Sequence, residues 1–421
     1  MLATSELIAE NGLAERLTEV LPHYLRTVPL YRQDGGRPLL EEPGEVMEAL
    51  RRLPLITKQD IRRNFPRNFL DGETNLETLL DEERIELEQT SGTSEQRTPL
   101  LLPRGWWAEQ EERALRLNSF VAGVLDDHPA VRRVTINSPV CSGEICYTGV
   151  PSRNERIVGN ALFVSLSRYP FLWSESELAR MAAEAQEWQP QFLDVDPVYG
   201  VVFARYCERK GLRLPSLRFV LCSYEYVSAA HRRILSRVFG VPVLDLYGST
   251  ETGHLLMEDE RGEMRPSLET AWLEVLEPDA AGVGALVVTT LTNDFMPLLR
   301  YRIGDLVERR ELPYRSRYVV HGRALDAFHP AGGGRVTTLQ IDECLADLEG
   351  IAHYQLVERH GDPWLMRFVP DATAPEPAVL VEVERRLTRL LALRHGLEIQ
   401  RTDLLVPETS GKFRLGYPAR K

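Results

Sequence analysis

The stretch VDPVYGVVFARYCERKGLRLPSLRFVLC, residues 195–222, carries the clearest structural signal in the chain. Asp196 is suited to cap a helix, Pro197 fits the first helical turn and Gly211 fits the helix end, while LRFVLC reads as an apolar strand. The residues that follow, SAAHRRILSRVFGVPVLDLYGSTETG (228–253), repeat this order of helix and strand. Two such units in succession indicate a βαβ pattern and a largely parallel sheet.

The pattern changes on both sides of this stretch. Residues 1–70 predict helices, one of them capped by Thr57 and beginning at Lys58. From about residue 268, short apolar segments separated by turn residues indicate antiparallel, barrel-like strands. The glycine cluster at 332–334 marks a flexible junction, and the segment beyond it predicts two helices and a hairpin around HGDP.

A chain of 421 residues is too long for one ordinary hydrophobic core. The sequence therefore predicts an α/β fold in two domains. The large N-terminal domain, residues 1–326, would contain mainly parallel sheets and a small barrel-like part. The small C-terminal domain, residues 327–421, would be a mobile α+β lid.

Composition narrows the class of protein and partner. The chain has no apolar stretch of about 18 residues, and its N-terminus lacks the basic and apolar regions of a signal peptide, so we expect a cytoplasmic protein without a membrane span. A formal net charge of -12 disfavours nucleic acid and anionic membrane surfaces as partners. The 5 cysteines lack Cys-x-x-Cys spacing, which argues against a zinc site or a disulfide framework and favours buried thiols. Small molecules are the expected partners.

A loop of small hydroxyl residues, TSGTSEQRTP (90–99), is a candidate phosphate cradle. Serines and threonines around a glycine allow backbone N–H groups and hydroxyls to converge on phosphate oxygens. The pattern is weak by itself, because such clusters are common in ordinary loops and the Gly-Lys-Ser/Thr ending of a Walker loop is missing.

DLYGSTETG (245–253) follows an apolar strand and is a second candidate. It places Tyr247 beside a glycine, where the ring can stack on a flat base. Thr250 and Glu251 follow, where a hydroxyl and a carboxylate can meet phosphate and magnesium. The structural alternative is an exposed turn between a strand and a helix.

Two further stretches carry one charged residue each. In YRIGDLV (301–307), Asp305 follows a glycine, a geometry in which a carboxylate can accept two ribose hydroxyl protons. In PETSGKFRL (407–415), Lys412 sits on a flexible Ser-Gly step and can reach developing phosphate charge. The structural alternatives are a hairpin turn and a surface lysine.

Together and in this order, these four stretches resemble the adenylate-forming superfamily of acyl-coenzyme A synthetases, adenylation domains and luciferases. The phenylacetate-coenzyme A ligase-like branch is the most similar, because LPLITKQDIRRNFP (53–66) resembles its N-terminal signature and HGRALD (321–326) a later motif. The resemblance covers nearly the whole chain. It implies that ATP and Mg²⁺ activate a carboxylic acid, here an aromatic one, as acyl-AMP with release of pyrophosphate. The acyl group would then pass to coenzyme A or to the phosphopantetheine thiol of a carrier protein.

The resemblance also implies roles for single residues. Lys412, Thr250 and Glu251 would be catalytic, with Glu251 holding magnesium and Lys412 bridging the attacking carboxylate and the α-phosphate. The nucleotide would be bound by Thr90, Ser91, Gly92, Thr93, Ser94, Arg97, Ser223, Tyr224, Glu225, Tyr247, Gly248, Ser249, Asp305 and Arg323. The acid would meet Cys141, Tyr147, Tyr199 and His254. Family members rotate the small domain to withdraw the lysine and admit a thiol.

The chain departs from the family pattern at the phosphate loop and at the hinge. Glu95 stands where a glycine is usual and Gln96 where a lysine is frequent. A carboxylate facing triphosphate would repel it, so Glu95 must point away, be offset by Arg97, or signal weakened ATP use. Leu325 precedes Asp326 at the expected pivot, where relatives often have paired aspartates, which leaves domain alternation open.

Other functions remain open at this point. A ligase of the same fold can use an amine acceptor or activate an oxyanion that is not a carboxylate. A catalytically silent relative would only bind a nucleotide or acyl ligand; Glu95 and Leu325 favour it, whereas the joint presence of Glu251, Asp305, Arg323 and Lys412 opposes it. An unrelated α/β protein with accidental motifs is the third reading. A homodimer is an open possibility for the assembly.

Overall fold

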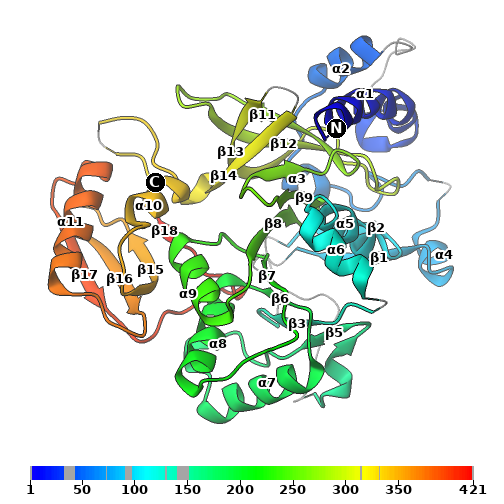
Figure 1. Ribbon diagram of the computed structural model, residues 1–421. Coiled ribbons are helices and arrows are strands. Elements are labelled where there is room, and N and C mark those ends of the chain that lie inside the picture. Colours follow the sequence, from blue (N-terminus) through cyan, green and yellow to red (C-terminus); the bar gives the residue numbers. More distant parts are fainter. Residues whose placement is uncertain are drawn as a thin grey trace. The chain divides into compact units, whose positions relative to one another are not determined.

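The computed structural model describes residues 2–32, 43–72, 74–90, 97–128, 130–139, 151–312, 315–330 and 332–419 (Figure 1). The chain forms two compact units. Unit 1 comprises Met1–Ala122 and Leu246–Val319, and unit 2 comprises Gly123–Asp245 and Val320–Lys421. Strands β8 (Val243–Ser249) and β14 (Arg315–Arg323) run through the boundaries. The predicted boundary at residue 326 lies inside unit 2 and stays a prediction.

Unit 1 combines N-terminal helices with antiparallel strands. Its helices are α1 (Leu2–Thr27), α2 (Pro43–Arg52), α3 (Lys58–Arg62), α4 (Leu76–Asp81), α5 (Trp106–Leu115) and the first part of α6 (Ser119–Asp127). Its strands are β1 (Ile85–Gln89), β2 (Pro99–Pro103), β9 (Gly253–Glu258), β10 (Met264–Pro266), β11 (Ala271–Leu276), β12 (Val283–Thr290) and β13 (Tyr301–Leu312). β1 and β2 pair with each other. The remaining strands, together with the boundary strands β8 and β14, follow the order β11-β12-β13-β14-β10-β9-β8.

The antiparallel prediction for the region after residue 268 is confirmed by the pairs β11–β12 and β12–β13. Closure into a barrel-like part stays a prediction. Apolar side chains from α1 and α2 pack with the buried Tyr301 of β13 in one core, among them Leu17, Leu21 and Leu50. Thr57 caps α3 as predicted, because its N–H donates to the Asp60 carboxylate at 2.9 Å in a capping box.

Unit 2 contains the parallel sheet that residues 195–222 predict. Its strands are β3 (Arg133–Ile136), β4 (Ile157–Val158), β5 (Ala161–Phe163), β6 (Phe192–Val195) and β7 (Phe219–Cys222), in the order β8-β7-β6-β3-β5-β4. β3 is parallel to β5 and β6, and β7 is parallel to β6 and β8. Helices α7 (Glu175–Trp188), α8 (Pro197–Lys210) and α9 (Ala229–Phe239) connect and flank these strands (Figure 1).

The ends of α8 are those that the sequence predicts. The Asp196 carboxylate accepts the N–H of Val198 at 3.1 Å, and Pro197 occupies the first turn. Gly211 ends the helix with a φ of 65°, a conformation that glycine adopts without strain.

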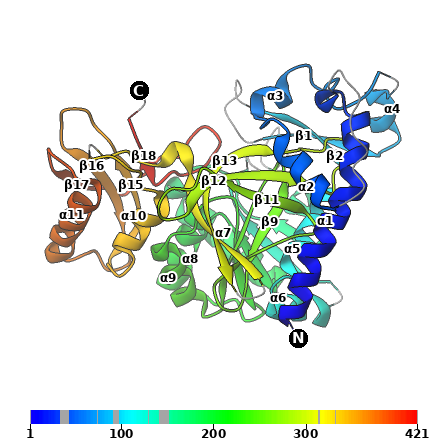
Figure 2. The ribbon, with the colours of Figure 1, turned by 90° about the horizontal axis from the view of Figure 1, so that it is seen from above.

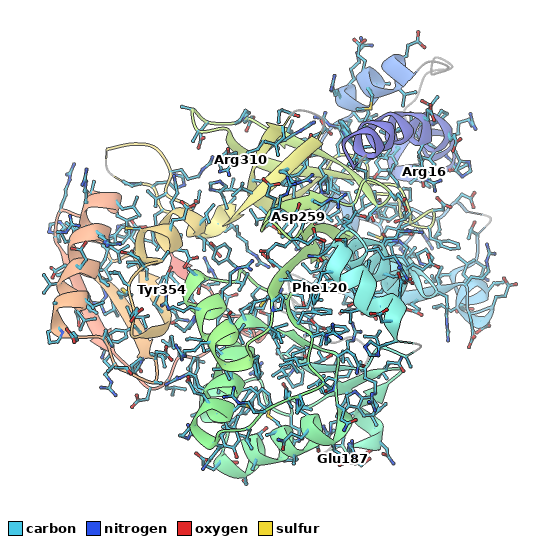
Figure 3. The ribbon with its side chains drawn as sticks, viewed as in Figure 1. Arg16, Phe120, Glu187, Asp259, Arg310 and Tyr354 are labelled. Carbon is cyan, nitrogen blue, oxygen red and sulfur yellow. The ribbon has the colours of Figure 1, made fainter. Side chains whose placement is uncertain are left out.

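The C-terminal part of unit 2 has a sheet of its own. Its strands, in the order β17-β16-β15-β18, are β15 (Ile351–Val357), β16 (Trp364–Pro370), β17 (Leu397–Arg401) and β18 (Gly416–Tyr417). Helices α10 (Thr338–Leu345) and α11 (Pro377–Leu391) lie against this sheet (Figure 2). Tyr354, labelled in Figure 3, belongs to the core between them, together with Ile341 and Leu387. The predicted helices and the hairpin of β15 and β16 are confirmed.

Among the helices of the described residues, none is both long and apolar enough to cross a membrane. Cys207 and Cys222 are buried free thiols, as predicted, and Cys344 is partly buried. Cys141 and Cys146 lie outside the described residues.

Candidate functional site

The base of the predicted phosphate loop is closed by two threonines at the ends of β1 and β2. The Thr90 N–H donates to the Thr98 carbonyl at 3.1 Å, and the Thr98 N–H donates to the Thr90 hydroxyl at 3.0 Å. Thr90 thus anchors the loop in this structure. The loop residues Ser91, Gly92, Thr93 and Ser94, with Glu95 and Gln96, lie outside the described residues, and Arg97 is exposed.

Glu251 is a buried carboxylate of unit 1. It lies in the turn between β8 and β9 and is only 5% exposed. Its Oε1 atom forms an ion pair with the Lys58 ammonium of α3 at 2.9 Å and accepts the Tyr301 hydroxyl of β13 at 3.0 Å. Three segments far apart in the sequence therefore meet at one carboxylate oxygen.

The electrostatics of this site keep Glu251 ionised. Burial alone would raise the pKa of its carboxyl group. The charge and hydrogen bond of Lys58 and a hydrogen bond from Ser249 outweigh burial, and the pKa lies below its ordinary value. The neighbouring Tyr301 hydroxyl has a raised pKa because it is buried beside this carboxylate, so it remains a donor.

This donor set fits the magnesium ion that the resemblance implies. Magnesium in proteins prefers oxygen ligands and is commonly held by one or two carboxylates and the phosphates of a substrate. Glu251 provides an ionised carboxylate, and the hydroxyls of Ser249 and Thr252, 3.0 Å apart, belong to the same turn. Thr250 lies between them and is partly buried.

Tyr247 and Asp305 form the second arrangement in unit 1. The Tyr247 hydroxyl on β8 donates to the Asp305 carboxylate on β13 at 2.6 Å. Gly248 follows Tyr247 at a tight crossing, where an added Cβ would lie 2.3 Å from the Gly253 carbonyl oxygen. The predicted adenine and ribose residues of this unit are thus brought together.

His254, predicted to contact the acid, is buried on β9 in unit 1. Its ring packs against Trp107 of α5, with the ring centroids 4.7 Å apart. Its role toward the acid stays a prediction.

In unit 2, the segment after β7 is organised by Asp194 of β6. The Ser223 hydroxyl donates to one carboxylate oxygen at 2.6 Å, and the Tyr224 hydroxyl donates to the other at 2.9 Å. Tyr224 has a φ of 72°, in the left-handed region that is unusual for a tyrosine. The hydrogen bond to Asp194 thus holds the side chain of a residue whose backbone is strained.

The Tyr224 carbonyl holds the Lys412 side chain. The Lys412 ammonium donates to the Tyr224 carbonyl oxygen at 2.9 Å. One residue further along each segment, the N–H of Phe413 donates to the Glu225 carboxylate at 2.5 Å. The predicted catalytic lysine and two predicted nucleotide-binding residues are neighbours within unit 2.

Two buried carboxyl groups surround this lysine. Burial raises the pKa of Asp196 to about 7, and the Lys412 charge opposes that rise. The pKa of Glu225 is raised well above its ordinary value by burial and by the Asp196 charge, while Lys412 and the exposed Arg323 lower it. These carboxyl groups thus favour a cation at the position of Lys412.

The predicted hinge is tied to the segment that follows Lys412. Leu325 is 82% exposed, whereas Asp326 is buried and its carboxylate pairs with Arg414 at 2.5 Å. Arg414 also pairs with Glu408 at 3.2 Å. An apolar, solvent-facing side chain thus occupies the expected pivot, and the rotation itself stays a prediction.

Tyr199, predicted to contact the acid, is fully buried in α8. Its hydroxyl lies 2.9 Å from the Gly411 carbonyl and 2.8 Å from the Arg168 carbonyl, so it supports the Lys412 segment in this structure. Cys141 and Tyr147 lie outside the described residues. The acid-binding roles of all three stay predictions.

Sequence reasoning missed Lys58, Tyr301 and Asp194 as members of these arrangements and treated Asp196 only as a helix cap. Lys58 carried one usable signal, because the chain has few lysines and this one lies in the stretch that resembles the N-terminal signature. Tyr301 begins strand β13 and Asp194 lies within β6, and neither position reveals in the sequence which distant side chain it faces.

Comparisons with known proteins agree with the resemblance seen in the sequence. No protein-family model matches the chain. It is 26% identical to a phenylacetate-coenzyme A ligase of Escherichia coli, covering 94% of this chain and 92% of that protein. It is also 26% identical to a phenylacetate-coenzyme A ligase of Thermus thermophilus, covering 82% of this chain and 77% of that protein.

Among solved structures, the chain is similar to a 2-hydroxyisobutyryl-CoA ligase in the postadenylation state in complex with 2-HIB-AMP. The TM-score is 0.69 at 18% identity, over 97% of this chain and 89% of that one. These similarities confirm the α/β fold class and the resemblance to the adenylate-forming superfamily and its phenylacetate-coenzyme A ligase-like branch.

Proposed function

We propose that the protein is an ATP-dependent ligase that activates a carboxylic acid as acyl-AMP, releases pyrophosphate and passes the acyl group to coenzyme A. The similarity to phenylacetate-coenzyme A ligases over 94% of the chain supports this activity. The observation that supports the proposal is the setting of each charged motif residue within its own unit. Glu251 is buried and ionised in unit 1, and Lys412 is held by the Tyr224 carbonyl in unit 2.

In the proposed reaction, a carboxylate oxygen of the acid attacks the α-phosphorus as the bond to pyrophosphate breaks. Lys412 offsets the charge that develops on the phosphoryl oxygens. Asp305, oriented by the Tyr247 hydroxyl at 2.6 Å, accepts the ribose hydroxyls. Magnesium bound at Glu251 would supply charge neutralisation at the phosphates. Catalysis rests on positioning and electrostatics, without a covalent intermediate on the protein.

Finer parts of the proposal follow the sequence predictions. The metal is Mg²⁺, the acid is aromatic, and the site lies in a cytoplasmic protein. The phosphopantetheine thiol of a carrier protein is the alternative acceptor, and a homodimer stays an open possibility for the assembly.

Acid-dependent pyrophosphate release tests the activity. The purified chain is incubated with ATP, Mg²⁺ and a panel of aromatic and aliphatic acids, and we expect release with at least one aromatic acid. Lys412→Ala should reduce that release by about 100-fold or more while nucleotide binding remains, because the ammonium acts on charge that develops in the transition state. Nucleotide binding without release with any acid would instead identify a catalytically silent relative.

A further inference from the structure

The Lys412 segment forms a compact turn with internal hydrogen bonds. The Gly411 N–H donates to the Glu408 carbonyl at 2.8 Å, and the Glu408 N–H donates to the Lys412 carbonyl at 2.8 Å. Gly411 has a φ of 87°, and a Cβ added there would lie 1.9 Å from the Ser138 hydroxyl. The turn therefore requires glycine both for its backbone conformation and for its close approach to Ser138.

Tyr224 and Glu225, which follow β7, hydrogen-bond to Lys412 and Phe413 respectively. The Tyr224 carbonyl accepts the Lys412 ammonium at 2.9 Å, and the Glu225 carboxylate accepts the Phe413 N–H at 2.5 Å. The first bond fixes the end of the lysine side chain. The second fixes the backbone from which that side chain extends, so the pair sets both position and direction.

The charge of Lys412 acts on two buried carboxyl groups near the turn. Asp196 and Glu225 are buried carboxyl groups that disfavour each other's ionised form, and the charge of Lys412 opposes that effect at both. Withdrawing the lysine would remove the cation that favours the ionised forms of both acids. The Phe413 N–H would lose its acceptor at the same time.

We propose that Glu225 is a positioning residue for adenylation: its carboxylate holds the Phe413 N–H, and thereby Lys412, in place for the first half-reaction only. This inference rests on the proposed function, in which the lysine serves acyl-AMP formation, and on the expected rotation that then withdraws the lysine. Glu225 therefore serves acyl-AMP formation and has no part in the transfer of the acyl group to the thiol.

Two variants separate the reach of the side chain from its ability to ionise. Glu225→Gln keeps an oxygen at the same distance from the backbone, so it still accepts the Phe413 N–H although it can no longer ionise. Its amide nitrogen takes the place of Oε2, which has no hydrogen-bond partner among the described residues. Glu225→Asp keeps an ionisable carboxyl group, but its side chain is one methylene too short to reach that N–H.

Each half-reaction is measured separately on the full chain. Acid-dependent pyrophosphate release in a single turnover reports adenylation, and thioester formation from a synthetic acyl-adenylate and coenzyme A reports the transfer. Glu225→Asp should slow adenylation by roughly 10- to 100-fold, the range for leaving a buried N–H without its acceptor, and change the transfer less than about 3-fold. Glu225→Gln should remain within about 5-fold of the parent in both.

The controls distinguish failure of this inference from failure of the proposed function. Glu398→Gln, on an exposed carboxylate of β17 that pairs with Arg359, should change neither half-reaction. Lys412→Ala is the reference: if it leaves adenylation unchanged, the proposed function is wrong at that residue. If Lys412→Ala slows adenylation, three results overturn the role of Glu225: full adenylation by Glu225→Asp, equal loss in both half-reactions, or a larger loss in Glu225→Gln than in Glu225→Asp.

Discussion

Unit 1 and unit 2 each bury acidic side chains at a predicted functional position, with opposite electrostatic results. In unit 1, the Glu251 carboxylate forms an ion pair with Lys58 at 2.9 Å, and the pKa of Glu251 lies below its ordinary value. In unit 2, Asp196 and Glu225 are raised in pKa by burial and share the field of Lys412. An ionised carboxylate is the kind of group that binds a metal ion. Two buried carboxyl groups near one ammonium group favour the presence of that ammonium group.

Removing the charge of Glu251 should have the largest effect. Glu251→Gln keeps the size of the side chain and loses the charge that attracts magnesium. We expect the Mg²⁺ concentration for half-maximal pyrophosphate release to rise by about 100-fold, because ligand charge governs affinity for hard cations. A Mg²⁺ titration of parent and variant measures this, and unchanged half-saturation would remove Glu251 from the metal site.

Removing the partner of Glu251 should have a smaller, conditional effect. Lys58→Met leaves a buried carboxylate without its cation, although the Lys58 side chain is 42% exposed and solvent weakens the pair. In the absence of magnesium we expect the variant to lose about 1–2 kcal/mol of stability. Denaturant unfolding with and without Mg²⁺ and ATP tests this: the ligands should restore more stability to the variant than to the parent.

If the loss of stability were equal with and without these ligands, magnesium would not replace the charge of Lys58 at Glu251. Arg52→Met provides a matched control, because Arg52 pairs with Glu48 on an exposed face of α2. Its removal should cost less than about 0.5 kcal/mol under either condition.

The raised pKa of Asp196 in unit 2 should make the stability of the protein depend on pH. Its pKa is about 7 in the folded chain, above its ordinary value of 3.8, so between these values the folded state binds more protons than the unfolded state. This contribution to stability is therefore greatest at low pH and is lost as the pH rises towards 7. Asp196→Asn keeps a capping side chain for α8 and removes the titration.

We expect the Tm of Asp196→Asn, relative to the parent, to rise by roughly 2–4 °C between pH 4.5 and 7.5. Thermal unfolding at several pH values measures the difference. Because the Lys412 charge lowers the pKa of Asp196, the same comparison made in a Lys412→Ala background should show a larger rise. A difference that is constant with pH, or that falls, would contradict the assigned direction.

Local patterns in the sequence predicted the elements that local chemistry determines. The caps of α8 and α3 were predictable because a side chain two or three residues from its backbone partner is visible in the sequence. The motif positions of Glu251 and Lys412 were predictable from the order of short stretches. Their orientation in space was not part of that signal.

The partners that set the chemistry come from distant segments. Lys58 lies in an N-terminal helix and Tyr301 in strand β13, yet both meet Glu251. The left-handed conformation of Tyr224 gives no local signal, since tyrosine rarely adopts it and the supporting Asp194 lies on another strand. Tertiary packing, not local preference, places these residues.

The fate of the carboxylate oxygen reports directly whether an acyl-AMP forms. An acid that supports pyrophosphate release is labelled with ¹⁸O in its carboxylate and converted with ATP, Mg²⁺ and coenzyme A, and AMP and phosphate are analysed by mass spectrometry. Attack on the α-phosphorus followed by thiol attack on the acyl carbon predicts one ¹⁸O atom in AMP. Unlabelled AMP, or label found in phosphate, would contradict acyl-AMP formation.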